Sequence, residues 1–375
     1  MQTAKYRVFL DGKSIDRSGL DRIETIVVQQ QMDQAWQASL DLLVCTTERG
    51  VWQEEDDALI QPFKRLRIEV AVDDKNTWVP LIDGPVVGYD SELSPEPSQS
   101  TITVRASDDS VFLWRTDDSK RWEGSDSKIA KDIFKASKAV VDTRIDDIDA
   151  STNDCVQAVM QRGSLIETLH ELASRHPGVH AWVAAGDKPG KSLGMFKKED
   201  TAPGDLPALV LLGAGRNMDS FSGNADQQRP ADVTGWALDL TDLSTRQATV
   251  KYNAVLVSAD KAAVDQKNVA VLVVPPGYAY GIDPKEIAER FAHEYGETFD
   301  ASGVVRSRCY AGVLQPYRVV EVKGVNGRLS GNYLIRSVTH TLTRSEYRQE
   351  FSLLRRGQSG GSNAPNPNKP KGKIS

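Results

Sequence analysis

The sequence predicts an α+β protein that is mainly β. Apolar and polar residues alternate with a period of two, as is typical of half-buried strands, in residues 6–10, 66–72 and 101–106. Three stretches with helix caps and helical apolar spacing lie among further strand patterns. Because 375 residues exceed the roughly 100 to 200 residues of one ordinary domain, we expect two or three domains.

A first β domain is expected in residues 1–108. Residues 91–100 are rich in Ser, Pro and Glu, which predicts a loop between two strands. The strand that follows this loop places three apolar side chains on one face: Ile102, Val104 and Ala106. The first hundred residues therefore predict a small antiparallel sheet or barrel.

An α/β region is expected in residues 109–203. Ser125 or Asp126 can cap a helix that continues to about residue 136, with one apolar face. Ser164 and Glu167 form a capping box, in which each side chain satisfies a free backbone amide of the other residue. These signals predict two helices in this region.

The end of this region is predicted from turn residues. Pro177 and Gly178 end the second helix, and residues 179–185 predict a strand. Residues 188–204 contain Gly, Pro and Lys, which indicates a domain boundary.

A second β domain is expected in residues 204–356. Asp283 as a cap, Pro284 in the first turn and Glu286 predict an inserted helix near 284–295, with Gly296 as its stop. Strands are expected at six places: 208–212, 234–239, 248–257, 318–322, 333–342 and 347–353. Residues 357–375 have almost no apolar side chains, which predicts a flexible tail.

Charge and composition exclude several classes of protein. The chain has 46 basic and 52 acidic residues, a net charge of -6, which is the wrong sign for binding a phosphate backbone, so we expect no nucleic-acid sequence recognition. No apolar run approaches the roughly 18 to 20 residues of a membrane span, so no membrane insertion is expected. The N-terminus lacks the pattern of a secretory signal, which indicates folding in the cytoplasm.

Histidines and glycines give two candidate sites, and both are predicted to be structural. His170, His176 and His180 carry imidazoles that could bind zinc, but Pro177 and Gly178 break their helical spacing. Residues 212–217 resemble a phosphate-binding turn but lack the third glycine and the lysine of the known motifs, so a hairpin or loop is expected.

Nucleophiles, carboxylates and tryptophans do not form a recognisable catalytic pattern. Residues 220–223 are not a GxSxG elbow, and residues 54–57 are an acidic run that predicts a solvated loop. The three cysteines, Cys45, Cys155 and Cys309, are expected to be buried reduced thiols. Four tryptophans could stack on sugars or bases, but core or interface packing is expected for them: Trp114, Trp122, Trp182 and Trp236. The sequence thus predicts no catalytic, cofactor-binding or metal-binding residues and no enzyme activity.

The order of several short motifs resembles one known family. The clearest succession is at the C-terminal end: Gly324, Leu329-Ser330-Gly331-Asn332-Tyr333, Val338-Thr339-His340 and Tyr347-Arg348-Gln349-Glu350-Phe351-Ser352-Leu353. Weaker matches lie at residues 82–89, 102–108, 127–133, 164–173 and 233–236. This pattern resembles late control protein D and the baseplate hub family of contractile phage tails and contractile injection systems.

The resemblance implies a fold and an assembly. It implies two tube-like antiparallel β-barrel domains with an α/β insertion region, and a homotrimer that joins the hexameric inner tube to the central spike. The partners would be a separate spike protein, the inner tube protein and other baseplate components. The protein would be assembled in the bacterial cytoplasm and then lie in the baseplate of a phage tail or phage tail-like particle.

One departure from the family and two alternative functions accompany this resemblance. Some members continue into a spike or a lysozyme domain, whereas this sequence stops at Ser375, so a separate spike and no fused hydrolase are expected. The tail lysines Lys369, Lys371 and Lys373 are either a contact to an acidic spike or tube surface or simply a solvating extension. A tail-tip peptidoglycan hydrolase would need a carboxylate pair or metal triad in a cleft, and a carbohydrate-binding β protein would expose tryptophans in a groove.

Overall fold

The computed structural model describes residues 4–44, 58–72, 77–94, 96, 99–115, 117–148, 158–238, 242–256, 260–274 and 283–359. Cys45, Cys155, the acidic run 54–57 and the lysines of the tail lie outside the described residues. Within the described part of the chain, no helix is long and apolar enough to cross a membrane.

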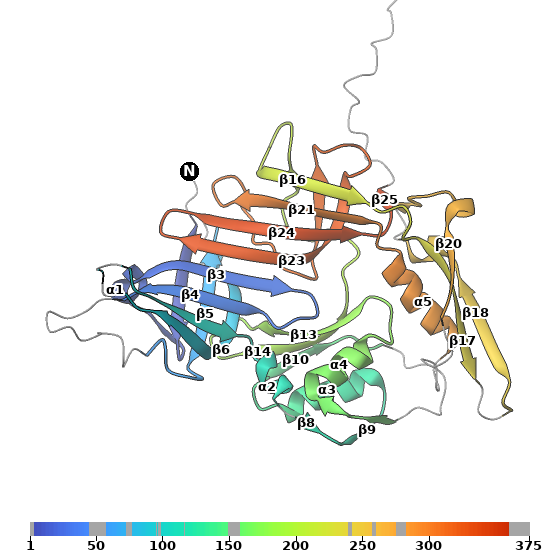
Figure 1. The fold of residues 1–375 in the computed structure, drawn as a ribbon, viewed down its shortest axis with the longest axis horizontal. Helices are drawn as coiled ribbons and strands as arrows, with labels where there is room; N and C mark the ends of the chain where they lie inside the picture. Colours follow the sequence, from blue (N-terminus) through green and yellow to red (C-terminus); the bar gives the residue numbers. More distant parts are fainter. Residues whose placement is uncertain are drawn as a thin grey trace, which may run out of the picture.

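One thirteen-stranded sheet dominates the molecule (Figure 1). Its strands from the N-terminal half are β1 (Lys5–Leu10), β2 (Lys13–Ser14), β3 (Ile23–Gln31), β4 (Gln37–Leu43), β5 (Arg65–Ala71), β6 (Val79–Glu92) and β7 (Thr101–Ser107). Those from the C-terminal half are β15 (Leu209–Val210), β16 (Met218–Ala225), β21 (Phe299–Arg306), β22 (Val319–Lys323), β23 (Gly331–Thr343) and β24 (Tyr347–Arg355). The strands predicted near residues 6–10, 66–72, 101–106, 318–322, 333–342 and 347–353 are confirmed, whereas the strand expected at 208–212 is reduced to β15.

The two halves of the chain meet in the middle of this sheet. The strand order is β16-β21-β24-β23-β3-β4-β7-β6-β5-β1-β2, and β22 pairs with β23 and β15. The pair β3 and β23, with Val28 opposite His340, joins the halves by backbone hydrogen bonds. Residues of the C-terminal half, among them Leu334 and Leu354, also belong to the hydrophobic core under the N-terminal strands. The structure is therefore mainly β as predicted, and closure into two separate barrels stays a prediction.

The α/β region lies below this sheet in Figure 1. It contains α2 (Ser110–Trp114), α3 (Asp126–Ala136) and α4 (Leu165–Ala173), and a sheet of β10 (Asp142–Ile145), β14 (Ser192–Lys198) and β13 (Val179–Ala185). Two short antiparallel pairs complete it: β8 (Asp117–Asp118) with β12 (Gly163–Ser164), and β9 (Arg121–Glu123) with β11 (Ala158–Met160). Both predicted helices are confirmed, because Ser125 caps α3 and Ser164 with Glu167 forms the capping box of α4.

Residues 188–204, where a domain boundary is expected, contain a strand that the sequence pattern did not predict. Ser192–Lys198 forms β14, which lies between β10 and β13 in the middle of the three-stranded sheet. The sequence hides this strand because Gly194 replaces an apolar side chain. An added Cβ at Gly194 would lie 2.5 Å from the ring of the buried Phe134, so the ring fills the space that a side chain would occupy.

A separate small unit at the right of Figure 1 replaces part of the expected second barrel. Its sheet consists of β18 (Thr245–Val250), β17 (Ala231–Leu238) and β20 (Ala270–Val273), and α5 (Pro284–Tyr295) packs against β17 and β18. The predicted helix is confirmed: Asp283 caps it, and Pro284 occupies the first turn. Gly235 is required because the carbonyl of Pro284 lies where its Cβ would be, which explains the glycine in residues 233–236.

Four shorter segments complete the small unit: two 3₁₀ helices and two short strands. They correct two further expectations from the sequence. The strand expected at 248–257 ends at Val250, because Tyr252–Val255 turns into the 3₁₀ helix η1 and buries Tyr252. A second 3₁₀ helix, η2 (Gln266–Asn268), follows. The flexible tail was expected from residue 357, but Gly357 is buried, and β25 (Gln358–Ser359) pairs with β19 (Asp260–Lys261). The short helix α1 (Arg17–Asp21) joins β2 to β3.

Candidate functional site

A polar face extends across eight consecutive strands of the large sheet, from β16 to β6. In β3, β4 and β7, alternate residues are buried in the core, and the intervening residues point away from it. One row of paired residues crosses six of the strands: Ser220, Val304, Glu350, Thr339, Gln29 and Gln37. Five of these six side chains are polar, and most of the neighbouring positions on this face are Ser, Thr or charged residues.

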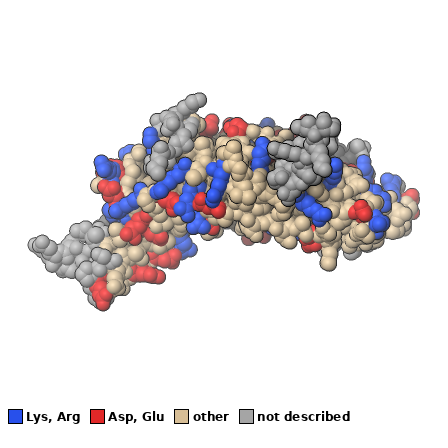
Figure 2. All heavy atoms as spheres, turned by 90° about the horizontal axis from the view of Figure 1, so that it is seen from above, with Lys and Arg blue, Asp and Glu red and all other residues tan. Residues whose placement is uncertain are grey.

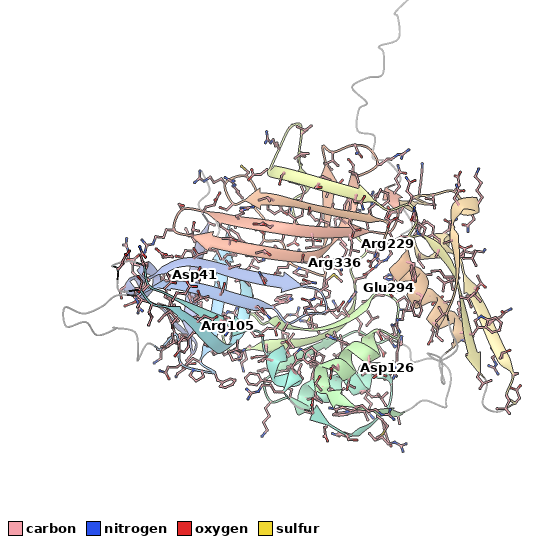
Figure 3. All side chains as sticks on the ribbon, in the orientation of Figure 1. Asp41, Arg105, Asp126, Arg229, Glu294 and Arg336 are labelled. Carbon is pink, nitrogen blue, oxygen red and sulfur yellow. The ribbon has the colours of Figure 1, made fainter. Side chains whose placement is uncertain are left out.

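The charges on this polar face occur in pairs of opposite sign. Arg105 lies 2.9 Å from Asp90, and Arg348 lies 3.0 Å from Glu350. Arg306 contacts Asp219 at 2.6 Å. Figure 3 labels Asp41 and Arg105 on neighbouring strands of this part of the sheet. The polar face is therefore hydrophilic without a dominant charge.

Figure 2 views the molecule from above the orientation of Figure 1. Lys and Arg are interspersed with Asp and Glu on this side, and large areas carry neither. No stripe of one sign, which a nucleic-acid-binding surface would show, is visible on this side.

Among the described residues, the eight-strand run has an unpaired edge at each end. Within that part of the chain, β16 pairs only with β21, and the part of β6 after Val86 pairs only with β7. Near the β6 edge, Val87 is 42% exposed and Tyr89 is 49% exposed. Unpaired strand edges are templates for pairing with another chain, and natural proteins usually protect them.

A buried network of charges ties the large sheet to the α/β region. The Arg67 side chain is 2% exposed and donates to Glu69 at 2.6 Å and to Asp83 at 2.9 Å. Arg67 also donates to the carbonyl of Gly186 at 2.7 Å, and Asp83 accepts from the backbone N–H of Gly190 at 2.9 Å. The network thereby fixes the β13–β14 turn against β5 and β6.

The same network extends to the start of α2. Arg65 donates to Asp83 and makes two hydrogen bonds to Asp109, at 3.1 and 2.7 Å. Gly84, which follows Asp83, has no room for a Cβ because the Ser107 carbonyl lies there. The alternation of charged residues in β5 was the available sequence signal for this network, but the local pattern does not reveal their partners.

The surroundings of His340 explain why the C-terminal motif contains a histidine. Its ring is fully buried, and its two nitrogens contact Tyr347 Oη at 2.8 Å and Gln30 Oε1 at 3.1 Å. Burial lowers the pKa of His340 to about 3, so the ring is neutral, accepts from Tyr347 and donates to Gln30. His340 thus joins β23, β24 and β3 at the seam between the two halves.

A cavity of about 500 Å³ lies where the large sheet, the α/β region and α5 meet. Figure 3 shows Arg336 and Glu294 on opposite sides of this junction. His293 of α5 lines this cavity, together with all three histidines singled out in the sequence: His170, His176 and His180. His293 was missed because its proximity depends on the packing of α5.

Each of the three histidines singled out in the sequence has a hydrogen-bond partner. His170 Nε2 lies 3.1 Å from the Ala181 carbonyl, and His176 Nε2 lies 3.0 Å from Asp126. His180 Nδ1 lies 3.0 Å from Asp33. Among the described residues, no group of three or more His, Cys, Asp or Glu is arranged to hold a metal ion.

Glu199, directly after β14, is the central charge of this junction. It contacts Arg356 at 2.5 Å, His293 at 3.2 Å and His180 at 3.6 Å. Burial opposes ionisation, but these three partners outweigh it and hold the pKa of Glu199 well below its usual range. Glu199 is therefore an ionised carboxylate surrounded by groups from three parts of the chain.

The remaining sequence candidates are dispersed. Residues 212–217 form the predicted loop, between β15 and β16, and 220–223 lie within β16. Trp122 is buried and donates to Gln161, and Trp182 stacks on Tyr317 with 3.8 Å between ring centroids, whereas Trp114 is 46% exposed. Trp236 is partly exposed on β17.

The expectation that the cysteines are buried is wrong for Cys309. Its thiol is free and exposed, because Cys309 lies in the turn that follows β21 rather than in a strand. Polar and turn residues surround it in the sequence, so the local pattern contained this information.

No protein-family model and no curated protein sequence matches the chain. Solved structures do match. The chain is similar to a 43 kDa tail protein of prophage MuSo2 from Shewanella oneidensis, with a TM-score of 0.65 and 14% identity over 94% of this chain and 98% of that one. A tail protein from Neisseria meningitidis matches with a TM-score of 0.58 and 14% identity, over 95% and 98% of the two chains.

A third match comes from a secretion system. An E. coli component of the type VI secretion system, described as structurally similar to the bacteriophage T4 tail proteins gp27 and gp5, has a TM-score of 0.54. Its identity is 11%, over 97% of this chain and 81% of that one. The chain therefore has the fold of phage tail proteins and of a type VI secretion component, which is the group that its C-terminal motifs resemble.

Proposed function

We propose that the chain is a structural hub of the baseplate in a contractile tail or injection system. In this proposal three copies form an adaptor that joins the hexameric inner tube to a separate central spike, and the protein is not an enzyme. The shared fold with tail proteins supports the class of protein. The polar face with two unpaired edges carries the proposal of a ring.

The direction of the strands is compatible with ring closure. All neighbours in the run from β16 to β6 pair antiparallel, so the first and the eighth strand run in opposite directions. A β6 edge can therefore pair antiparallel with the β16 edge of the next copy. Such a head-to-tail contact makes a ring when its rotation closes.

The dimensions of the ring follow from the strand spacing. Three copies of eight strands give twenty-four strands, and a spacing of about 4.8 Å gives a circumference of about 115 Å and a backbone diameter of about 37 Å. The apolar core lies on one side of the run, so the polar face would line the channel. The residues of that face, mostly hydroxyl, amide and paired charged groups, suit a wet channel.

The two halves of the chain have equivalent roles in this ring. Residues 1–108 and 204–356 each contribute four strands of the run, and these halves are the two barrel-like domains of the proposal. Residues 109–203 and the small unit around α5 lie outside the run. The tail after Ser359 would contact the spike or other baseplate components, and the assembled protein would lie in the baseplate after assembly in the bacterial cytoplasm.

Cysteine cross-linking tests the proposed contact between copies. Ser222 of β16 and Asp90 of β6 are exposed on the polar face, so Ser222→Cys and Asp90→Cys are placed together in a background in which Cys45, Cys155 and Cys309 are replaced by serine. The proposal predicts covalent three-chain species after mild oxidation. Such species form readily only if the β16 edge of one copy lies next to the β6 edge of the following copy.

A second double variant provides the control. Leu243→Cys with Asp90→Cys, in the same background, also has two reactive cysteines in each chain, but Leu243 is 73% exposed on the small unit and lies outside the eight-strand run, so no three-chain species are expected. If the Ser222→Cys, Asp90→Cys chain assembles normally but stays uncross-linked, or if the control cross-links to the same degree, the proposed edge contact is contradicted.

A further inference from the structure

The small unit is held to the α/β region by polar groups rather than by a shared core. Its hydrophobic core consists of residues of β17, β18, α5 and their flanks, including Val233, Ile287 and Ala292, and contains no described residue of the α/β region. The side of α5 that faces the cavity carries charged and polar side chains: Arg290, His293, Glu294 and, after the helix, Glu297. The position of the unit relative to the α/β region therefore depends on this polar contact.

The contact is tight at one point. Gly178 has a positive φ of 69°, and a Cβ there would lie 3.1 Å from the His293 ring and 3.2 Å from Glu199 Cδ. The Glu199 backbone N–H donates to the Gly178 carbonyl at 2.7 Å. The turn after α4 therefore packs directly against both the Glu199 carboxylate and the His293 ring.

We propose that the cluster of His293, Glu199 and Arg356 is a pH-sensitive latch that releases α5 and its sheet from the α/β region on acidification. At neutral pH, Glu199 is shared by Arg356 and His180, and a neutral His293 donates to it. Protonation of His293 adds a further cation beside those two. Separation of the small unit lets that cation reach water.

Several charged groups surround His293 in this latch. Glu199 faces it from the end of β14, His180 from β13 and Arg356 from the chain after β24. More distant groups of the cavity come from its own helix, the β3–β4 turn and β23: Arg290, Glu294, Glu297, Asp33 and Arg336. Glu199 is already engaged by Arg356 and His180, and these two cations also contact Glu297 and Asp33. Charge on His293 is therefore disfavoured mainly by its burial.

The direction of the pH effect follows from the two histidines. Burial lowers the pKa of His293, and the attraction of Glu199 only partly opposes this effect. The neutral ring therefore stabilises the contact above the ordinary histidine pKa of about 6.5, and this stabilisation is lost as the pH falls below that value. Burial also disfavours charge on His180, but Asp33 and Glu199 outweigh it and raise the pKa of His180 to about 9, so His180 stays charged throughout this range.

Amide hydrogen exchange of the full-length protein tests the latch. Rates are measured at pH 7.5 and pH 5.5 and corrected for the intrinsic pH dependence of exchange. The latch predicts that α5 and β17 exchange several-fold faster at pH 5.5, while β3 and β23 keep their protection. If β3 and β23 lose protection to the same degree, the change is global unfolding and the latch is wrong.

Three variants assign the effect to the cluster. His293→Gln should abolish the pH dependence of α5 exchange, and Glu199→Gln should make α5 exchange fast already at pH 7.5. His170→Gln is the matched control, because burial also lowers the pKa of His170 in the same cavity, yet it contacts Ala181 and not α5. Unchanged pH dependence in His293→Gln, or its loss in His170→Gln, would overturn the proposal.

Discussion

Single residues connect the parts of this chain, and Arg67 is one of them. Its guanidinium lies between Glu69 and Asp83 and reaches the β13–β14 turn. Removing one member of a buried charge pair leaves the other without compensation, which costs about 3–5 kcal/mol. Glu69 and Asp83 retain Arg7 and Arg65, so the lower end of that range applies.

The first prediction concerns this residue. Arg67→Met should lower the free energy of unfolding by about 3 kcal/mol, measured by urea denaturation. Arg105→Met is the matched control, since Arg105 pairs with Asp90 on an exposed face, and its loss should change stability by less than about 1 kcal/mol. Equal losses in the two variants would show that burial of the network is not what stabilises it.

Residue-scale prediction from the sequence succeeded for local signals. Ser164 with Glu167, and Asp283 with Pro284, are helix starts whose partners lie within a few residues, so the spacing itself contained the interaction. Glu199 with His293 could not be predicted in this way, because the two residues meet only after three units have packed together. The stacking of Trp182 on Tyr317 is another contact between distant segments.

At the scale of elements, β14 shows where the pattern of the sequence fails. A strand is normally recognised in a sequence by side chains of alternating polarity. Gly194 has no side chain, and the ring of Phe134 from α3 fills the space where one would lie. The strand is therefore specified by a side chain that lies sixty residues earlier. The small unit could not be recognised from the sequence for a different reason. Only the pairing of its strands distinguishes them from those of the large sheet.

The second prediction tests this account of β14. Gly194→Ala should lower the free energy of unfolding by about 1–3 kcal/mol, the usual cost of overpacking, because Phe134 is fully buried and cannot move away freely. Gly327→Ala, where no atom lies within 4 Å of the added Cβ, should change stability by no more than about 0.5 kcal/mol. Thermal or urea unfolding distinguishes the two, and a neutral Gly194→Ala would contradict the packing argument.

At the scale of the whole molecule, the pair β3 and β23 joins strands of the two halves of the chain in one sheet. The length of this sheet depends on pairing between distant segments, which no local stretch of sequence displays. The predicted class, α+β and mainly β, was recovered because period-two patterns are local. The joining of the N-terminal and C-terminal strands was not, since it depends on pairs such as Val28 with His340.

The central claim is that this sheet is one third of a closed ring. Sedimentation velocity of the full-length chain, alone and with the spike protein of the same particle, measures this most directly. Our account predicts an assembly of three copies of the 41.2 kDa chain, with Tyr89→Glu at the β6 edge shifting it to single chains and Leu243→Glu on the small unit leaving it intact. A chain that sediments as a single copy at every concentration, with and without the spike, would contradict it.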